Sequence, residues 1–477
     1  MAVVEVEKRP ALSGQLAPGS SLGPAGRATL QRTMVGQAQA RSAATPELYL
    51  KLFIVALFIP EGFSFFIGDF RLTVARVLLM VFSIKALLRY LSGPARVFIL
   101  SDLSVLGVAI WMLMASTVTG GFIGLKGAGI TAIEFAGCYY MFRYSLDSVN
   151  SSVEIVWFAC KVTVVVIAVA LLDPLTGTLF TYELARQITG YAKPGVAEAL
   201  ATHSDGLFRD GLIRAEGPLE HSILFGCVCA WFGTLAFFTF PRRFFGWCIA
   251  AFALVGLWFS QARGAWVAYI IAFALSGYYV VTRQFPLRWK LVGLALGVVV
   301  ISVFLVSGSP IATLMKLGGL SPEAAWYREA IWTWAWPLVM NSPLFGIGSS
   351  WDWEASGYLV GSSVDAFWLE NSMEYGFPAT VFVFLTVASP FWRGPMDNSP
   401  YLSPEERRLS VALGIVTTTF VFMGFIVHFW GICWILVGAF PAIRASLDEA
   451  VTLRERAAQP SNRHRRVRNL AIRTKRF

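Results

Sequence analysis

The chain has 477 residues, of which 56% are hydrophobic and only 14% are charged, and its formal net charge is +10. Because a soluble domain has roughly 25% charged residues, this composition excludes a soluble protein and indicates a polytopic membrane protein. The positive charge is concentrated in the ends and the short loops, where it indicates orientation in the membrane and not affinity for nucleic acid.

The two ends of the chain differ from its middle. Residues 1–46 are rich in Ala, Gly, Ser, Gln and Pro and lack the short hydrophobic stretch of a signal peptide. We predict that they form a disordered cytoplasmic tail. Residues 447–477 are basic, and we predict a cytoplasmic tail that lies against anionic lipid head groups. Residues 47–446 form the predicted transmembrane domain.

Apolar segments of about the 20 residues that a bilayer crossing needs run through this middle region. They predict an all-α, polytopic integral membrane helix bundle of about twelve transmembrane helices. With both termini in the cytoplasm, the Lys and Arg residues of the short loops fall on the cytoplasmic side at almost every turn. The predicted spans are 48–67, 72–90, 98–118, 128–146, 153–172, 221–240, 243–260, 264–282, 289–308, 372–392, 409–428 and 430–446.

Two predicted outer loops are long, at about 173–220 and 309–371. Loops of this length in a compact protein are usually functional, so we expect the site on the outer face. The second loop is rich in tryptophan, which favours amphipathic helices at the membrane interface. An alternative role for these rings is stacking on sugars. The tryptophans are Trp326, Trp332, Trp334, Trp336, Trp351, Trp353 and Trp368.

Three arginines, Arg214, Arg263 and Arg328, fall on the predicted outer side. An arginine at the edge of a bilayer is costly to hold unless it has an anionic partner. Three such residues on one face predict a site for a phosphate-bearing, membrane-bound substrate. The alternative is that each side chain extends to a lipid phosphate.

The residues around these arginines form an ordered set of motifs. In chain order the set is Arg214 with Gly217, Arg263 with Gly264, Arg328 with Trp332, Gly346 with Gly348, and Leu369 with Glu374 and Gly376. Over residues 205–392 this order resembles the O-antigen ligase and polymerase family of polytopic membrane proteins. Where ligases of that family have His-Asn, this chain has Asp365 and Ala366. The acidic residue favours the exopolysaccharide polymerase branch.

The resemblance implies a glycosyltransferase-type enzyme of the bacterial inner membrane that works without a metal or another cofactor. Its implied substrate is an oligosaccharide linked to undecaprenyl pyrophosphate, and its implied reaction joins repeat units into surface polysaccharide with inversion. The implied partners are this lipid-linked oligosaccharide, membrane lipids, a chain-length regulator and the export machinery, with no nucleic acid.

Site roles follow from the same resemblance. Arg214, Arg263 and Arg328 would hold the pyrophosphate and stabilise its charge as it leaves. Asp365 would be the general base that takes a proton from the acceptor hydroxyl. The alternative for Asp365 is an ordinary solvated carboxylate in a loop.

Four further residues are candidates for contact with the substrate. Glu220 and His221 precede the sixth span and are alternatives for the base, although a histidine at a helix start is more often structural. Glu370 and Glu374 are four residues apart on one predicted helix face and could orient sugar hydroxyls. The alternative is that these two carboxylates only cover the protein surface.

Two charged residues, Glu134 and Lys161, fall inside the predicted spans four and five. Because such residues are costly in lipid, we expect both to face the interior of the bundle. One interpretation is that they pair with each other.

Other functions stay open at this point. A ligase would move a finished glycan to a lipid A core or a protein. A flippase for lipid-linked sugars would need charged residues along a path through the membrane and often has internal repeats. The sequence shows few buried charges and no clear repeat. A non-catalytic partner of an export complex would tolerate substitution of the arginines.

Overall fold

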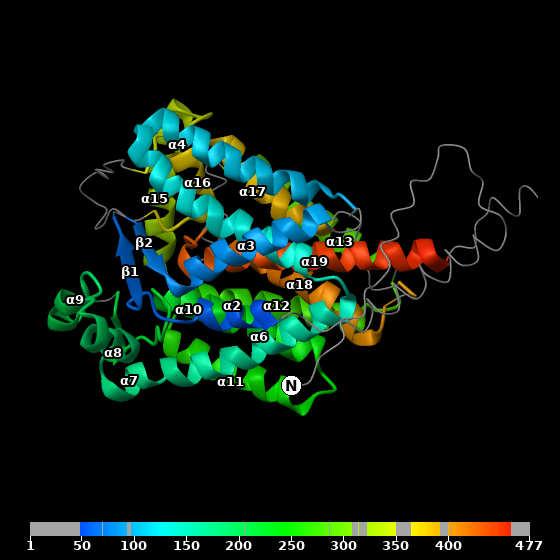
Figure 1. Ribbon diagram of the computed structural model, residues 1–477, viewed down its shortest axis with the longest axis horizontal. Helices are drawn as coiled ribbons and strands as arrows, with labels where there is room; N and C mark the ends of the chain where they lie inside the picture. Colours follow the sequence, from blue (N-terminus) through cyan, green and yellow to red (C-terminus); the bar gives the residue numbers. More distant parts are fainter. Residues whose placement is uncertain are drawn as a thin grey trace, which may run out of the picture.

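The computed structural model is a bundle of α-helices with two short β-hairpins (Figure 1). It describes residues 48–68, 70–92, 97–204, 206–285, 287–307, 313, 322–349, 364–391, 399–400 and 402–458. The predicted tail 1–46, the chain beyond Ala458, and parts of the second long loop, including Trp351 and Trp353, lie outside the described residues.

The first half of the chain contains both hairpins and the shorter helices. Its helices are α2 (Leu48–Leu57), α3 (Val74–Ser92), α4 (Leu100–Ala132), the π-helix η1 (Ile133–Gly137), α5 (Cys138–Ser145), α6 (Val149–Ala170), α7 (Leu172–Thr176), α8 (Phe180–Thr189) and α9 (Val196–Thr202). The antiparallel hairpins are β1 (Ser64–Ile67) with β2 (Phe70–Thr73), and β3 (Phe208–Arg209) with β4 (Leu212–Ile213).

In the second half, the regular elements of the described residues are all helices. Its helices are α10 (Ser222–Thr239), α11 (Phe244–Ser260), α12 (Arg263–Val281), α13 (Arg288–Val306), α15 (Pro322–Asn341), α16 (Phe367–Tyr375), α17 (Phe377–Ala388), the 3-10 helix η2 (Ser389–Phe391), α18 (Pro404–Met423) and α19 (Gly431–Ala458). Helix α19 continues past residue 446, where the sequence predicted the start of a tail.

Five helical segments of the described chain are long and apolar enough to cross a membrane. Each of the twelve predicted spans overlaps a helix, so the structure is that of a multi-helix membrane protein. Three more apolar helices are shorter than a full crossing. The five longer segments are Leu100–Ser145, Val149–Thr176, Ser222–Thr239, Arg263–Val281 and Gly431–Glu455.

The predicted span 48–67 is helical only in its first part, because α2 ends at Leu57 and a hairpin follows. Pro60 explains the break, since proline lacks an N–H and disfavours helix in the residue before it. The turn before β1 packs on α8, where Thr189 Oγ1 donates a hydrogen bond of 3.0 Å to the Gly62 carbonyl. The hairpin therefore leaves the bundle and joins the first long loop.

The long segment Leu100–Ser145 reverses direction within α4, at Gly121, which has φ 55° and ψ −141°. A Cβ atom at Gly124 would lie 2.4 Å from the Ser116 carbonyl oxygen. Residues eight apart on a straight helix are about 12 Å apart along the axis, so the two arms must be antiparallel. The separate predicted spans 98–118 and 128–146 correspond to these arms. Glycine is needed at the reversal because this backbone conformation is closed to other residues.

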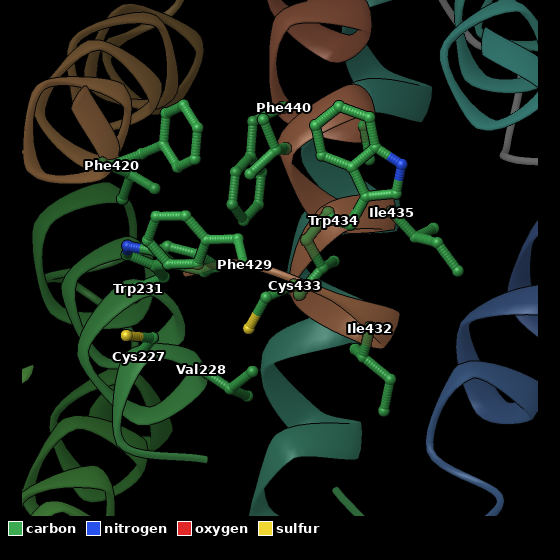
Figure 2. Close-up of a cluster of buried hydrophobic side chains, with 14 of the residues drawn as sticks. Cys227, Val228, Trp231, Phe420, Phe429, Ile432, Cys433, Trp434, Ile435 and Phe440 are labelled. Atoms are coloured by element: carbon green, nitrogen blue, oxygen red, sulfur yellow. The ribbon is translucent and has the colours of Figure 1, made fainter. Parts of the chain in front are cut away.

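The core is centred on α10 and α19, and it fixes the loop between α18 and α19. Figure 2 shows Trp231 of α10 facing Phe429 of that loop and Phe440 of α19. The Trp231 ring centroid is 5.6 Å from that of Phe429 and 5.7 Å from that of Phe440. Phe420 of α18 packs on Phe429 at 4.9 Å. These contacts hold the loop in a defined position.

The two ends of the bundle are different (Figure 1). One end, which we call the loop end, gathers α7, α8, α9, the β1–β2 hairpin, α15 and α16. The carboxyl-terminal half of α19 extends from the opposite end. The described parts of both predicted outer loops therefore lie at the same end of the molecule.

The predicted pairing of Glu134 with Lys161 is wrong. Glu134 accepts a hydrogen bond of 2.6 Å from Nε of Arg76. The Lys161 Nζ lies 5.9 Å from the centre of the Phe158 ring. Helix α3 packs on η1 and brings Arg76 to Glu134 across 58 residues of sequence, which no local pattern indicates.

Candidate functional site

Arg214 is buried at the loop end, just after the β3–β4 hairpin. Its side chain is held by backbone carbonyls: Nε donates to Ser260 at 3.2 Å, and one terminal nitrogen donates to Gly206 at 3.0 Å. Burial lowers the pKa of Arg214 to about 10, and Arg209 lowers it further, while Glu216 opposes this shift. The structure thus holds a positive charge here mainly by carbonyl dipoles.

The junction of α11 and α12 brings two more arginines to this position. Arg209 donates a hydrogen bond of 2.5 Å to the carbonyl of Gln261, which ends α11 with φ 50°. Arg263 begins α12 two residues later. The hairpin and the helix junction therefore bring Arg209 and Arg214 to the start of the helix that carries Arg263.

Arg328 of α15 lies within electrostatic range of Asp365 and Arg263. Burial lowers the pKa of Arg328, Asp365 opposes this shift, and Arg263 adds to it. Burial and Asp365 together raise the pKa of the neighbouring Tyr327. The structure thus brings Arg328 close to the other two residues that the sequence pattern selected, and their chemical roles stay predictions.

Lys193 extends the positive region toward α10. Its Nζ forms an ion pair with Glu216 and donates a hydrogen bond of 2.8 Å to the carbonyl of Glu220. We use the name cation cluster for Lys193, Arg209, Arg214, Arg263 and Arg328.

The two residues before α10 lie against this cluster. His221 caps α10, because its Nδ1 accepts a hydrogen bond of 3.1 Å from the N–H of Ile223. Burial lowers the pKa of His221 to about 3, and Arg214 lowers it further, so the ring is neutral. Burial, followed by the Glu61 carboxylate, raises the pKa of Glu220 to about 8. Glu220 therefore holds a proton at neutral pH.

A groove of two adjoining chambers lies among α3, η1, α16 and α19. Both chambers are lined by Glu134 and Gly431, so they share a wall. The first chamber has a volume of about 20 Å³ and the second about 140 Å³. The first is lined by Leu57, Ile59, Glu61, Thr73, Ala75, Arg76, Glu134, Pro218, Glu220, Gly431, Ile432 and Ile435.

The second chamber combines aromatic rings with polar groups. Glu370 and Glu374 both line it, as their predicted position on one face of α16 requires. Nδ1 of His428 forms an ion-pair contact with Oε2 of Glu370. Flat aromatic faces beside carboxylates are suited to sugars, which have an apolar ring face and hydroxyl edges. The lining residues are Met112, Thr131, Glu134, Phe367, Glu370, Asn371, Glu374, Tyr375, His428, Phe429, Trp430, Gly431 and Trp434.

A row of rings joins the cation cluster to the second chamber. The His221 ring lies 5.9 Å from Trp430, and Trp430 stacks on His428 at 5.3 Å with an angle of 15° between the planes. His428 in turn stacks on Phe367 at 6.4 Å. Because His221 lies against Arg214, the cation cluster and the second chamber are linked by these rings.

Backbone contacts position both sides of the second chamber. The N–H of Phe367 donates to the Val427 carbonyl at 3.0 Å, which ties the start of α16 to the loop before α19. At the end of that loop Gly431 has φ 53°, and a Cβ there would lie 2.1 Å from Oε1 of Glu220. Glycine is therefore required for this close approach. The predicted turn residues Gly346 and Gly348 also have positive φ.

Sequence reasoning missed several residues of the groove, notably Glu61, Arg76, His428 and Trp430. His428 is a single histidine at the end of a predicted span, followed by Trp430 and Gly431. Gly431 interrupts two apolar runs, and this interruption was the feature of the sequence that could have indicated a loop carrying His428. Glu61 and Arg76 were assigned to spans or their edges, so nothing indicated that they would meet Glu220 and Glu134.

A family model described as O-Antigen ligase matches residues 248–384 of this chain. The matched segment contains Arg263, Arg328 and Asp365 together with α16, and it ends before the loop that carries His428. No curated protein matches the chain.

Proposed function

We propose that this chain joins lipid-linked oligosaccharide repeat units into surface polysaccharide or exopolysaccharide, and the match of residues 248–384 to the O-antigen ligase model supports this proposal. The observation that carries this proposal is the cation cluster beside a groove of aromatic rings and carboxylates. In a sugar attached to undecaprenyl pyrophosphate, the pyrophosphate would bind the cation cluster and the sugar would bind the groove.

The arginines would act on the pyrophosphate. Arg214 is held by carbonyls, and Arg328 is partly buried close to a second arginine, so an anion that binds there stabilises both charges. In the reaction the carbon–oxygen bond between the donor sugar and its pyrophosphate breaks, and the carrier pyrophosphate leaves with the electron pair. Fixed cations stabilise that developing charge.

The new bond forms between an acceptor hydroxyl oxygen and the anomeric carbon of the donor. Attack on the face opposite the leaving group inverts the anomeric centre. The hydroxyl proton needs an acceptor, and Asp365 is the residue that the sequence pattern proposes. Its position beside Arg328 also supports a second role, in which Asp365 orients that guanidinium.

The proposal includes an orientation. The loop end would face the periplasm and both termini the cytoplasm, because most short loops predicted to be cytoplasmic carry the Lys and Arg residues. The enzyme would lie in the bacterial inner membrane and work with a chain-length regulator and export machinery. Asp365 in place of a histidine favours a polymerase, and the alternative is a ligase with lipid A core or protein as its acceptor.

The test is the size of carrier-linked and secreted glycans in a deletion strain. The strain is complemented with wild type, with Arg263→Ala, or with Arg186→Ala as the control. Arg186 is an arginine of α8 at the same end, exposed and paired with Glu183. We expect polymer with wild type and the control. The deletion and Arg263→Ala should leave single-repeat glycans on the carrier, since loss of one stabilising contact costs about 100- to 1,000-fold in rate.

Other outcomes would redirect the assignment. Long glycans retained on the carrier in the deletion strain would show a ligase. Repeat units retained in the cytoplasmic leaflet would show a flippase. Normal polymer length with Arg263→Ala at wild-type protein levels would contradict the role of the cation cluster.

A further inference from the structure

His428 and Glu370 come from different elements and meet in the second chamber. His428 lies in the loop between α18 and α19, and Glu370 lies on α16. Nδ1 of the imidazole contacts Oε2 of the carboxylate, and the two side chains are 27% and 22% exposed. This contact sets the Glu370 carboxylate beside Nδ1, so Nε2 is the ring nitrogen left to accept a proton.

Neighbouring rings fix the plane of this imidazole. Trp430 stacks on it at 5.3 Å with 15° between the planes, and Phe367 stacks at 6.4 Å with 27°. An imidazole held by a carboxylate and two aromatic rings has little rotational freedom. Its orientation is therefore set before a substrate arrives, as efficient proton transfer requires.

The charges that face His428 across the second chamber are carboxylates. Glu370 and Glu374 come from α16, and Glu134 comes from η1, where it is paired with Arg76. Among the residues that line the chamber no lysine or arginine is present. The second chamber is therefore lined by carboxyl groups, in contrast to the cation cluster.

Asp365 lies in the opposite electrostatic environment. Its charge is felt by Arg328, which is also close to Arg263. A carboxylate among guanidinium groups is suited to orienting them and to balancing their charge. Asp365 is therefore suited to the pyrophosphate end of the substrate, where it would orient arginines. His428 is suited to the sugar end, where it would accept a proton.

We propose that the second chamber binds the acceptor sugar and that His428, oriented by Glu370, takes the proton from the attacking hydroxyl. Trp430 and Trp434 contact the ring face, and Glu374 and Asn371 contact hydroxyls. The oxygen bonds to the donor anomeric carbon, the pyrophosphate leaves with its electron pair, and the proton moves to Nε2 of His428. This inference rests on the proposed function and names the acceptor site within it.

The test uses the full-length protein in lipid nanodiscs with lipid-linked repeat units as donor and acceptor. The variants are His428→Gln, Glu370→Gln and Asp365→Asn, with His203→Gln as the control. His203 is an exposed histidine that ends α9 at the same end of the molecule. Turnover and KM for each lipid-linked substrate are measured, and binding of undecaprenyl pyrophosphate reports on folding.

We expect His428→Gln to lower turnover by at least about 100-fold while it binds undecaprenyl pyrophosphate like the wild type. Glu370→Gln should give an intermediate loss, because the imidazole stays but its orientation is no longer fixed. Asp365→Asn should act mainly through a raised donor KM. His203→Gln should match the wild type.

Two results would overturn the proposal. If His428→Gln keeps wild-type turnover while Asp365→Asn loses it at an unchanged donor KM, Asp365 is the base. If wild type forms no glycosidic bond with these substrates, the proposed function fails and this inference fails with it. Activity in wild type and in His428→Gln alike overturns the inference alone.

Discussion

Two buried arginines at different places in the bundle are compensated in contrasting ways. Arg143 is 0% exposed, donates to Asp102 at 3.1 Å and forms an ion pair with Glu449. Arg214 is 3% exposed, and its hydrogen bonds go to the carbonyls of Ser260 and Gly206. The first charge is balanced within the chain by two carboxylates, and the second mainly by dipoles.

This difference is the one expected between an arginine that only stabilises the fold and an arginine that binds an anionic ligand. A buried ion needs both hydrogen bonds and an opposite charge to offset its loss of water. Arg143 has both, so a bound anion would not stabilise its charge further. Arg214 has hydrogen bonds but only a more distant carboxylate, and its lowered pKa reflects the missing compensation. A phosphate from outside would supply the missing charge.

The largest loss of stability is expected when Arg143, whose charge is balanced by two carboxylates, is replaced. Arg143→Ala leaves Asp102 and Glu449 buried without their cation, so we expect a loss of about 3–5 kcal/mol in the free energy of unfolding. The measurement is thermal unfolding of the purified protein in detergent. A midpoint within error of the wild type would show that the network contributes little, and the contrast with Arg214 would then fail.

Arg214→Ala should have a smaller effect on stability and a large effect on activity. The carbonyls of buried Ser260 and exposed Gly206 lose their donor, which costs about 1–3 kcal/mol. Polymer formation should nevertheless be lost, and added undecaprenyl pyrophosphate should raise the unfolding midpoint of the wild type but not of the variant. Equal stabilisation of both proteins by this ligand would contradict a phosphate-binding role.

The third prediction concerns an incompletely compensated acid. The pKa of Glu220 is raised to about 8 from its ordinary value of 4.5, so the folded protein keeps a proton that the unfolded chain loses. Stability must therefore fall as pH rises through this window, by up to about 1.4 kcal/mol per pH unit, and level off above it. Glu220→Gln should remove this slope.

The check is the unfolding midpoint of wild type and Glu220→Gln at several pH values on both sides of neutrality. Glu183→Gln is the control, because that carboxylate is exposed. Parallel curves for wild type and Glu220→Gln would show that Glu220 does not hold the proton.

The smallest loss of stability is expected at an ion pair that is partly exposed to solvent. Arg243 and Glu405 lie 2.9 Å apart with side chains that are 38% and 33% exposed. Because water screens such pairs, Arg243→Gln should cost about 1 kcal/mol or less. A loss as large as that of Arg143→Ala, measured in the same unfolding experiment, would show that burial is not what separates the two sites.

The helices of the bundle could be predicted well from the sequence, because lipid requires long apolar segments. The span 48–67 was the clear exception, where Pro60 ends the helix and the chain turns into a hairpin. The meeting of Arg263, Arg328 and Asp365 was also predictable from the motif order and from the side of the membrane.

The two chambers of the groove could not be predicted in the same way. His428 meets Glu370, Arg76 meets Glu134, and Glu61 meets Glu220 through helix packing between distant segments. Each of these residues is a single polar group in or beside an apolar run, with no repeated spacing to mark it. Periodicity locates a helix, but it does not tell which helix will lie beside it.

The loop between α18 and α19 has a consequence for exchanging parts between relatives. Residues 248–384 are recognisable as a family segment, whereas His428, Trp430 and Gly431 lie after it and Glu134 and Glu220 lie before it. A chimera that receives only the recognisable segment would inherit Arg263, Arg328 and α16 but keep the host's facing wall. If the second chamber binds the acceptor as we propose, acceptor choice in such a hybrid would follow the host, and specificity could diverge without a change in the matched segment.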